Sequence, residues 1–346
     1  MEHKRENTKE INQEIEEKDA DKQPLVSVIL VTYKKYDGIY TVLDSLFAQR
    51  YPNIELIIQD DGAFNFIQYC DKITQYIQEN KGPNIRNVVI NHLEENVGTS
   101  KNINAGISLA KGKYIKLLTA DDGLFDNTVI ESCVAYCEQH NARILVGQTY
   151  VKPRNGNSIH EVKDTMWYRW KARNGRMSTI VPSNQDISYL SSLTHEKCND
   201  LLASRCIIST VSVFYRADIF EETKGFPEEY RYVEDMPFWP YLAKRGEFFH
   251  FSHIIMMTYE LNGISNGGEL RGEFLREACD IMRTLYIPNE VRGGILNAWI
   301  KKERLREQDY MEHSDMFEKK DYIKYIDVII YKVVMHIKYL LLGTKL

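Results

Sequence analysis

Short apolar runs that alternate with helix-like stretches constrain the fold of this chain more than any other feature of its sequence. The runs are rich in Val and Ile, as strands are, and we expect strands over 25–33, 54–62, 87–94, 113–122 and 143–150. The segments "YDGIYTVLDSLFAQRY" and "VGTSKNINAGISLAKG" between them have helical spacing, and the second is expected to close on Gly112. This order predicts an α/β fold, a mostly parallel Rossmann-like sheet sandwiched by helices.

The composition is that of a soluble globular protein with one large core or two ordinary ones. The chain has 346 residues, of which 43% are hydrophobic and 27% are charged. A net charge of -5 gives no reason to expect a nucleic-acid partner. The six cysteines are scattered without a CxxC pair, so we expect reduced thiols, with Cys133 and Cys137 packed in the core rather than bound to metal.

The two ends of the chain differ from its middle in composition and in the spacing of apolar residues. Residues 1–23 are densely charged, are expected to be disordered and lack the apolar region of a signal peptide, which indicates a cytoplasmic location. Residues 151–205 have weak periodicity, as a long functional insertion would. Strands are expected again over 206–216 and 248–260, and the texture is helical from about residue 269 onward, with a clear amphipathic repeat over 274–285.

Polar segments follow three of the expected strands, where the sheet of an α/β protein binds its ligands. Asp121 and Asp122 end the strand in "LLTADDG", and two adjacent carboxylates at a partly buried position need a positive partner. Mg²⁺ or Mn²⁺ together with a nucleotide diphosphate would meet that need. The alternative is an Asx turn that caps the next helix.

A second acidic pair and a lysine extend this pattern. Asp60 and Asp61 precede Gly62, which permits a sharp turn. A carboxylate there can accept the N3–H of a pyrimidine while Tyr33 stacks on the base, although helix capping by Asp61 is the alternative. Lys101 falls in the early turns of an expected helix, where phosphate binds well, unless it is only a solvated surface charge.

Several motifs carry a resemblance to a known family. The run "VSVILVTYKKYDGIYTVLDSLFAQRYPNIELIIQDDGAFN" resembles the start of the family 2 glycosyltransferases, which have the GT-A fold. The stretch "ENVGTSKNINAGISLAKGKYIKLLTADD" is similar to the family's N-x-G-x-x-x-A-R-N-x-G segment and its metal-binding D-x-D region. The segment "EEYRYVEDMPFW" resembles the acidic motif that carries the catalytic base. The likeness covers about residues 25–265, with the motifs in the family's order.

The resemblance implies where the nucleotide sugar would bind. Tyr33 and Asp61 would hold a uracil base, with Thr32 and Asp60 beside them. Lys101 stands where the family usually has an arginine near the diphosphate.

The resemblance also implies a metal site and a catalytic pair. Asp121 would bind Mn²⁺ or Mg²⁺, and Asp122 would support it or contact the ribose side. Asp235 would be the general base, and Glu234 would support it or help to bind the acceptor.

Three positions depart from the family pattern. Thr119 occupies the place of the first Asp of D-x-D, which leaves one carboxylate fewer than usual. Lys34 replaces the Asn that commonly follows the tyrosine, and Asn262 stands where the family has a His or Arg in a flexible loop.

These residues predict an inverting transfer of a sugar from a nucleotide-diphosphate donor, UDP-linked by the resemblance, to a glycan or lipid-linked acceptor in cell-surface polysaccharide synthesis. Asp235 would deprotonate the acceptor hydroxyl, while Lys101 and a metal at Asp121 neutralise the departing diphosphate. One alternative is an inactive, glycosyltransferase-like binding or scaffold subunit, which Thr119 makes conceivable. A nucleotidyltransferase fits less well, because no glycine run follows the first strand.

On this interpretation, residues 24–268 form the catalytic domain, with a nucleotide-sugar half over 24–122 and an acceptor half over 123–268. Residues 262–268, "NGISNGG", are either a lid over the donor or a connector. Residues 269–346 form a helical extension, in which charged residues interrupt the amphipathic stretch 322–343 too often for it to span a bilayer. Its basic stripe fits the inner face of an anionic membrane, the catalytic domain or a second subunit of a homo-oligomer.

Overall fold

A computed structural model describes residues 23–152, 179–259 and 271–289, together with residues 305 and 308. The chain divides into two compact units. The first contains the described residues up to 96, 102–143 and 214–225. The second contains 97–101, 144–213 and the described residues from 226 onward.

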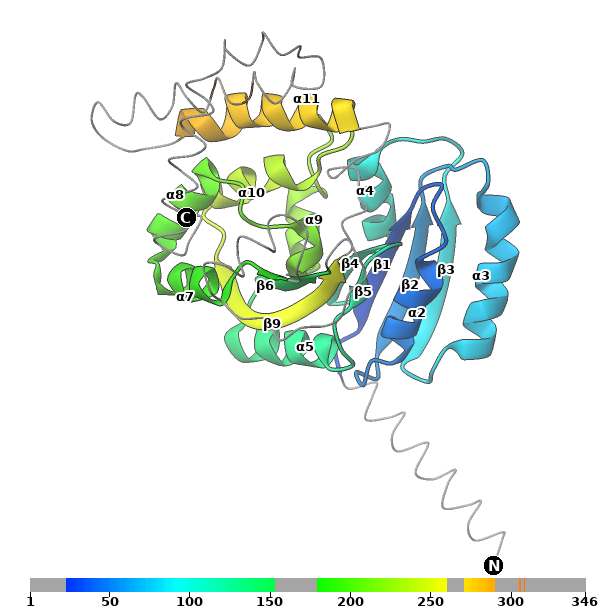
Figure 1. Ribbon diagram of the computed structural model, residues 1–346. Coiled ribbons are helices and arrows are strands. Elements are labelled where there is room, and N and C mark those ends of the chain that lie inside the picture. The colour runs from blue at the N-terminus through cyan, green and yellow to red at the C-terminus, as the bar shows by residue number, and fades with distance from the viewer. Residues whose placement is uncertain (1–22, 153–178, 260–270, 290–304, 306–307, 309–346) are drawn as a thin grey trace, which may run out of the picture. The chain divides into compact units, whose positions relative to one another are not determined.

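The first unit is built on a largely parallel sheet (Figure 1). Strands β1 (Val26–Thr32), β2 (Ile54–Asp60), β3 (Ile85–His92) and β4 (Tyr114–Thr119) run parallel in the order β3-β2-β1-β4. Strand β8 (Val213–Arg216) is antiparallel to β4. Almost every residue of β1 and β2 is buried, which explains why their sequences are predominantly apolar rather than alternating. The predicted parallel α/β sheet is confirmed for these strands.

Two helices of this unit, α2 (Ile39–Phe47) and α4 (Thr99–Leu109), lie where the periodicity predicts helices. The unit also contains α3 (Phe66–Asn80), α5 (Val129–His140), α9 (Asp218–Thr223) and the short strand β5 (Gly123–Leu124). Because the crossovers between parallel strands are right-handed, the strand order places α2 and α3 on one face of the sheet and α4 on the other.

The predicted end of α4 at Gly112 is wrong. The helix stops at Leu109, and the following backbone turns toward the sheet instead. The Lys111 N–H donates to a Glu55 carboxylate oxygen at 2.6 Å, and the Gly112 N–H donates to Ser27 Oγ at 2.8 Å. A buried Ser27–Glu55 pair on β1 and β2 thus takes the hydrogen bonds that a helix cap would otherwise take.

The second unit contains further strands and a group of helices. Strand β6 (Ile144–Val151) is parallel to β9 (Phe249–Tyr259) and antiparallel to β7 (Thr179–Val181). The helices are α7 (Asn184–Ser192), α8 (His195–Ser204), α10 (Asp235–Lys244) and α11 (Arg271–Ile281). After α11 come a single π-helical turn over Met282–Tyr286 and a 3₁₀ turn over Ile287–Asn289.

The strand expected over 206–216 is only partly present. Residues Thr210–Ser212 form a 3₁₀ turn, and β8 begins at Val213. Trp239 on α10 donates its indole N–H to the Ile208 carbonyl at 3.0 Å. The backbone at 208 is therefore satisfied by a side chain rather than by a neighbouring strand, and the prediction for 206–212 is wrong.

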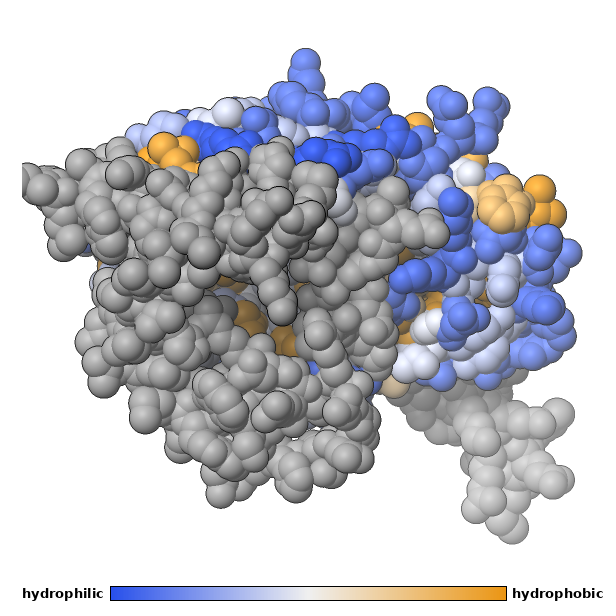
Figure 2. All heavy atoms as spheres, turned by 45° about the horizontal axis from the view of Figure 1, so that its top comes forward, coloured by the Kyte–Doolittle hydropathy of each residue, from blue (hydrophilic) through white to orange (hydrophobic). Residues whose placement is uncertain are grey.

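The cysteines and the described surface agree with what the composition predicts. All six cysteines are free thiols, and Cys133 and Cys137 lie fully buried on α5. The described part of the face in Figure 2 is mainly hydrophilic. Phe64 and Ile67 are the most exposed of the large apolar side chains described, at 81% and 73%. Among the described helices, none is long and apolar enough to cross a bilayer.

Some predictions concern residues that the structure does not describe. They are the disordered start of the chain (1–22), the part of the predicted insertion over 153–178, the glycine-rich segment 262–268 with Asn262, and the amphipathic segment 322–343. The described boundary between the units also differs from the predicted halves, because the first unit takes in residues 123–143 and 214–225.

Candidate active site

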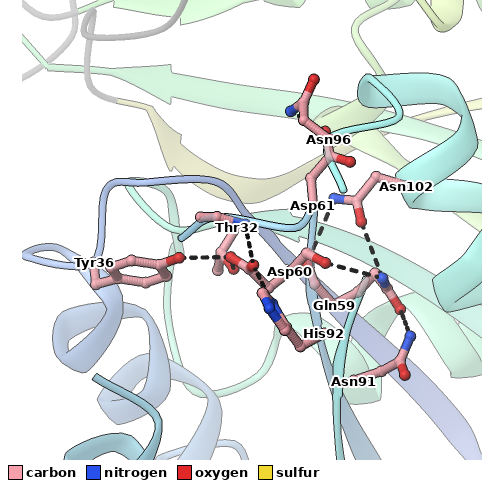
Figure 3. Close-up of polar contacts among 10 residues, drawn as sticks. Thr32, Tyr36, Gln59, Asp60, Asp61, Asn91, His92, Asn96 and Asn102 are labelled. Atoms are coloured by element: carbon pink, nitrogen blue, oxygen red, sulfur yellow. Dashed lines mark hydrogen bonds and ion pairs between the residues drawn. The ribbon is translucent and has the colours of Figure 1, made fainter. Parts of the chain in front are cut away.

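Asp60, the last residue of β2, is completely buried and accepts hydrogen bonds from several groups of the protein (Figure 3). The Tyr36 hydroxyl donates at 2.6 Å, the Thr32 hydroxyl at 3.0 Å and the Ala63 N–H at 2.9 Å. His92 Nδ1, at the end of β3, lies 2.8 Å from the carboxylate. A buried carboxylate requires such partners, and these link the ends of β1, β2 and β3.

Tyr36 and His92 were not singled out by sequence reasoning. Burial, with the hydrogen bond to Asp60, raises the pKa of Tyr36 far above its ordinary value, so the phenol remains a donor. The His92 ring stacks on Phe66 with 4.9 Å between centroids. His92 ends an apolar run at the same edge as the two acidic pairs, and that position was the signal that could have identified it.

A second buried network stands beside the first. Gln59 is completely buried, accepts a hydrogen bond from Asn91 Nδ2 at 2.8 Å and donates one to Asn102 Oδ1 at 3.0 Å (Figure 3). Asn91 belongs to β3 and Asn102 to α4. These amides fix α4 against the ends of the strands.

Asp61 points in a different direction from Asp60 in Figure 3. Its Oδ2 accepts a hydrogen bond from Asn96 Nδ2 at 2.7 Å, and its own N–H donates to the Thr32 carbonyl at 3.0 Å. Gly62 then adopts φ +67°, and a Cβ there would lie 2.3 Å from the Glu95 carbonyl carbon. The turn after β2 and the loop before α4 are thus in close contact, with Asp61 between them.

Tyr33 lies on the turn that follows β1. Lys34 has φ +61°, and the Lys35 N–H donates to the Tyr33 carbonyl at 2.8 Å across it, which makes a strained three-residue turn. The Lys34 ammonium lies 4.8 Å from the centroid of the partly exposed Tyr33 ring. This tight turn ends the strand and presents Tyr33 at the end of the sheet.

The carboxylates of Asp121 and Asp122 have different surroundings. Asp122 is 2% exposed and accepts a hydrogen bond from the Thr119 hydroxyl at 2.6 Å. Asp121 is partly exposed and lies by the β1–α2 loop, where a Cβ on Gly38 would be 3.2 Å from its Oδ1. Thr119, which replaces a carboxylate of the family pattern, therefore orients the second aspartate.

Lys116 on β4 is a further charged residue that sequence reasoning missed. Its side chain is completely buried in the middle of an apolar strand. Burial lowers the pKa of Lys116 to about 8, and the nearby Cys133 and Asp122 oppose that shift. Asp122 thus has a buried lysine as well as Thr119 in its surroundings.

Asp121 could hold a divalent metal with the help of a nucleotide. The described residues contain no group of three or more His, Cys, Asp or Glu side chains arranged for a metal. Mg²⁺ and Mn²⁺ are commonly bound by one or two carboxylates and by the phosphates of the substrate. Asp121, which is more exposed than Asp122, fits that kind of site.

The second unit carries the other predicted residues. Lys101 is exposed in the first turn of α4, where the helix dipole favours phosphate. Glu234 occupies the N-cap position of α10, without a capping hydrogen bond from its side chain, and Asp235 is the first residue of the helix. The Thr210 hydroxyl donates to Glu234 at 2.8 Å, and the Thr210 N–H lies 3.4 Å from an Asp235 oxygen. Sequence reasoning missed Thr210 because it lies 25 residues earlier in the chain.

The surroundings of Glu234 and Asp235 favour a role for this pair in general-base catalysis. Burial raises the pKa of both Glu234 and Asp235 above the ordinary carboxylate range, and the charge of Asp235 raises that of Glu234 further. A carboxylate with a raised pKa accepts a proton more readily at neutral pH.

Tyr33, Asp60, Asp61 and Asp121 lie at the carboxyl ends of β1, β2 and β4 within the first unit. The structure brings together Glu234, Asp235 and Thr210 within the second. That both sets act on one substrate is a prediction.

The fold of the chain is of the GT-A type. The solved structure of the mannosyltransferase PcManGT from Pyrobaculum calidifontis, in complex with GDP-Man and Mn²⁺, has a similar fold. Its TM-score is 0.53 at 11% identity, over 91% of this chain and 82% of that chain. The predicted fold class is thereby confirmed.

The sequence profile of glycosyl transferase family 2 matches residues 27–192, just under half of the chain, and the predicted resemblance to that family is confirmed over these residues. The glycosyltransferase GlyG of Streptococcus pneumoniae is 31% identical over 127 residues, which are 36% of this chain and 39% of GlyG. The Escherichia coli enzyme WfaP, a UDP-Glc:alpha-D-GlcNAc-diphosphoundecaprenol beta-1,3-glucosyltransferase, is 34% identical over 128 residues, or 37% of this chain and 47% of WfaP. The matched regions thus span less than half of each of these relatives.

Proposed function

We propose that this protein transfers a sugar from a nucleotide-diphosphate donor to a hydroxyl group of a glycan or lipid-linked acceptor, with inversion at the anomeric carbon. The observation that carries this proposal is the group of polar side chains at the carboxyl ends of β1, β2 and β4. Asp61 is held there by Asn96, and Asp121 lies by the β1–α2 loop.

The donor is a UDP-sugar in this proposal. Tyr33 stacks on the uracil, and the Asp61 carboxylate accepts its N3–H. Thr32 and Asp60, whose hydrogen bonds are made inside the protein, shape the turn that carries them. The name of WfaP specifies a UDP-linked donor and a diphosphoundecaprenol acceptor, and this supports a role in cell-surface polysaccharide synthesis.

Asp121 would hold a divalent metal beside the diphosphate, and Lys101 would supply a second positive charge. Asp121 would hold Mn²⁺ or Mg²⁺, which supplies positive charge where the leaving group gains negative charge. Asp122 keeps this strand end in place through Thr119. Lys101 adds its own charge from the first turn of α4.

Asp235 acts as the general base. It takes the proton of the acceptor hydroxyl while the hydroxyl oxygen bonds to the anomeric carbon and the bond to the diphosphate oxygen breaks on the opposite face. Burial raises the pKa of Asp235, while hydrogen bonds from Thr210 oppose part of that shift. The loss of such a base costs a factor of about 10²–10⁴ in rate.

Calorimetry with UDP, with and without Mn²⁺, combined with a transfer assay over a panel of nucleotide sugars, tests this function. We expect metal-dependent UDP binding and donor-dependent transfer by the wild type, and binding without transfer by Asp235→Asn. Tight UDP binding by the wild type with neither hydrolysis nor transfer of any donor would favour a scaffold subunit instead. Equal turnover by the wild type and Asp235→Asn would exclude Asp235 as the base.

A further inference from the structure

The backbone that leads into the acidic pair is held by a side chain of α11. The Arg231 N–H donates to Glu277 Oε1 at 2.9 Å, and the Tyr232 N–H donates to Glu277 Oε2 at 2.7 Å. These amides lie outside any helix or strand, so no regular ladder supplies their acceptors. Hydrogen bonds from N–H groups to a charged carboxylate are stronger than those between neutral groups.

Two further hydrogen bonds from the same region flank the acidic pair. The Tyr230 hydroxyl donates to Asp280 on α11 at 2.8 Å, three residues after Glu277. The Tyr286 hydroxyl, from the π-helical turn after α11, donates to the Met236 carbonyl at 2.6 Å. The chain is thus tethered just before Glu234 and just after Asp235.

Apolar packing adds to these polar contacts. Val233, Ile281 and Tyr286 form a buried cluster, with 1%, 0% and 0% exposure. Val233 immediately precedes the acidic pair, and the other two come from the end of α11 and the turn after it. Partly buried side chains of both segments pack around this cluster, namely Tyr230, Tyr232, Met236, Phe274, Ala278, Met282 and Leu285.

The hydrogen bonds to Glu277 control a different feature of the backbone from the apolar cluster. The apolar cluster fixes how closely α11 packs, but it does not orient the peptide planes of 230–232. A carboxylate that takes one N–H on each oxygen orients those planes, because both bonds depend on their direction. The Thr99 N–H and the Ser100 hydroxyl hold the carbonyl side of the same planes, at Arg231 and Tyr230. The side chains of Glu234 and Asp235 follow within a few residues of these planes.

We propose that Glu277 is a positioning residue for the transfer reaction. It holds the backbone of 231–232 so that the Asp235 carboxylate meets the acceptor hydroxyl in the right geometry. This inference rests on the proposed function. It extends the catalytic machinery to a helix that lies beyond residues 27–192, the part that the family profile matches.

The test compares Glu277→Gln and Glu277→Ala with Arg276→Gln, a change at an exposed charge on the same helix. Gln has the shape of Glu but one carbonyl acceptor, while Ala has none. We expect kcat for sugar transfer to fall by about 10-fold in Glu277→Gln and further in Glu277→Ala, as the loss of hydrogen bonds to a charged group implies. The acid limb of the kcat–pH profile should move in both variants, whereas KM for the donor and the stoichiometry of UDP binding should not change. Arg276→Gln should behave as the wild type.

Three outcomes overturn the inference. The first is wild-type kcat and an unmoved acid limb in Glu277→Ala while Asp235→Asn is inactive. The second is a loss of kcat that only matches a loss of UDP-binding stoichiometry, because that would show a role in folding alone. The third is an equal loss in Arg276→Gln. If Asp235→Asn itself retains full turnover, the proposed base fails, and that result is separate from any effect of Glu277.

Discussion

Asp60 and Asp61 are neighbours in the sequence, yet their side chains have different partners. Asp60 is surrounded by Thr32, Tyr36, His92 and a backbone N–H, and it holds three strand ends together. Asp61 is turned toward Asn96 at the edge of the same group. At this scale the sequence predicted that acidic residues gather here. It could not predict which one is structural, because that depends on side chains from β3 and from the β1–α2 loop.

Substitution of these two residues by Asn should separate structure from binding. Asp60→Asn places an NH₂ group among hydrogen-bond donors, and we expect the free energy of unfolding to fall by about 1–3 kcal/mol. Asp61→Asn should instead weaken UDP binding by about 10-fold, since the amide loses the charge that accepts the base N–H. Urea denaturation and UDP calorimetry on both variants measure the two effects. Stronger weakening of UDP binding in a fully folded Asp60→Asn than in Asp61→Asn would reverse the assignment.

The acidic pair predicts a pH dependence. Because burial raises the pKa of Asp235 and Glu234, kcat should rise with pH through a limb that lies above the ordinary carboxylate range. The pair titrates as a unit, so Glu234→Gln removes the repulsion and should shift that limb to lower pH. The kcat–pH profiles of the two proteins test this. A limb at the same pH in both would show that Glu234 does not influence the base.

The raised pKa values of Glu234 and Asp235 also make the free energy of unfolding depend on pH. The folded state binds the protons of this pair more tightly than the unfolded chain does. The pair therefore lowers the free energy of unfolding as pH rises from the ordinary carboxylate pKa through the raised values. Glu234→Gln should lose less unfolding free energy as pH rises. In urea denaturation, the stability of this variant relative to the wild type should therefore grow between acidic and alkaline pH. A difference that is constant with pH would contradict the raised pKa.

The secondary-structure elements could be predicted where burial is uniform. Strands β1, β2 and β4 follow from continuous apolar runs, although the predicted strands extended into the polar turns after Thr32, Asp60 and Thr119. Lys116 could not be recognised as buried, because lysine is almost never buried without partners that only the fold supplies. Glu277 could not be linked to the acidic pair, since its contacts are to backbone N–H groups more than 40 residues away.

The turn between β2 and α3 depends on Gly62. An alanine there would need both a positive φ and a Cβ within 2.3 Å of the Glu95 backbone. We expect Gly62→Ala to lower the free energy of unfolding by more than the roughly 1 kcal/mol of the backbone strain alone. Gly246→Ala is the matched control, because Gly246 has φ +79° and nothing within 4 Å of the added atom. Equal destabilisation in the two variants would show that contact with Glu95 is unimportant.

At the scale of the whole molecule, the predicted site residues are divided between the two compact units. The first unit contains the residues proposed to bind the uracil and the metal, and the second contains Lys101 and the acidic pair Glu234–Asp235. The family and the GT-A fold predicted from the sequence are confirmed. The division into units at 96–102, 143 and 213–226 was not predicted, because the chain passes between them several times rather than once.

The central claim is that residues remote in the sequence serve one nucleotide sugar and one metal ion. A crystal structure of the full chain with UDP and Mn²⁺ tests it most directly. The account predicts uracil against Tyr33 and Asp61, and Mn²⁺ between the diphosphate and the Asp121 carboxylate. UDP bound away from these side chains, or Mn²⁺ bound without Asp121, would contradict it.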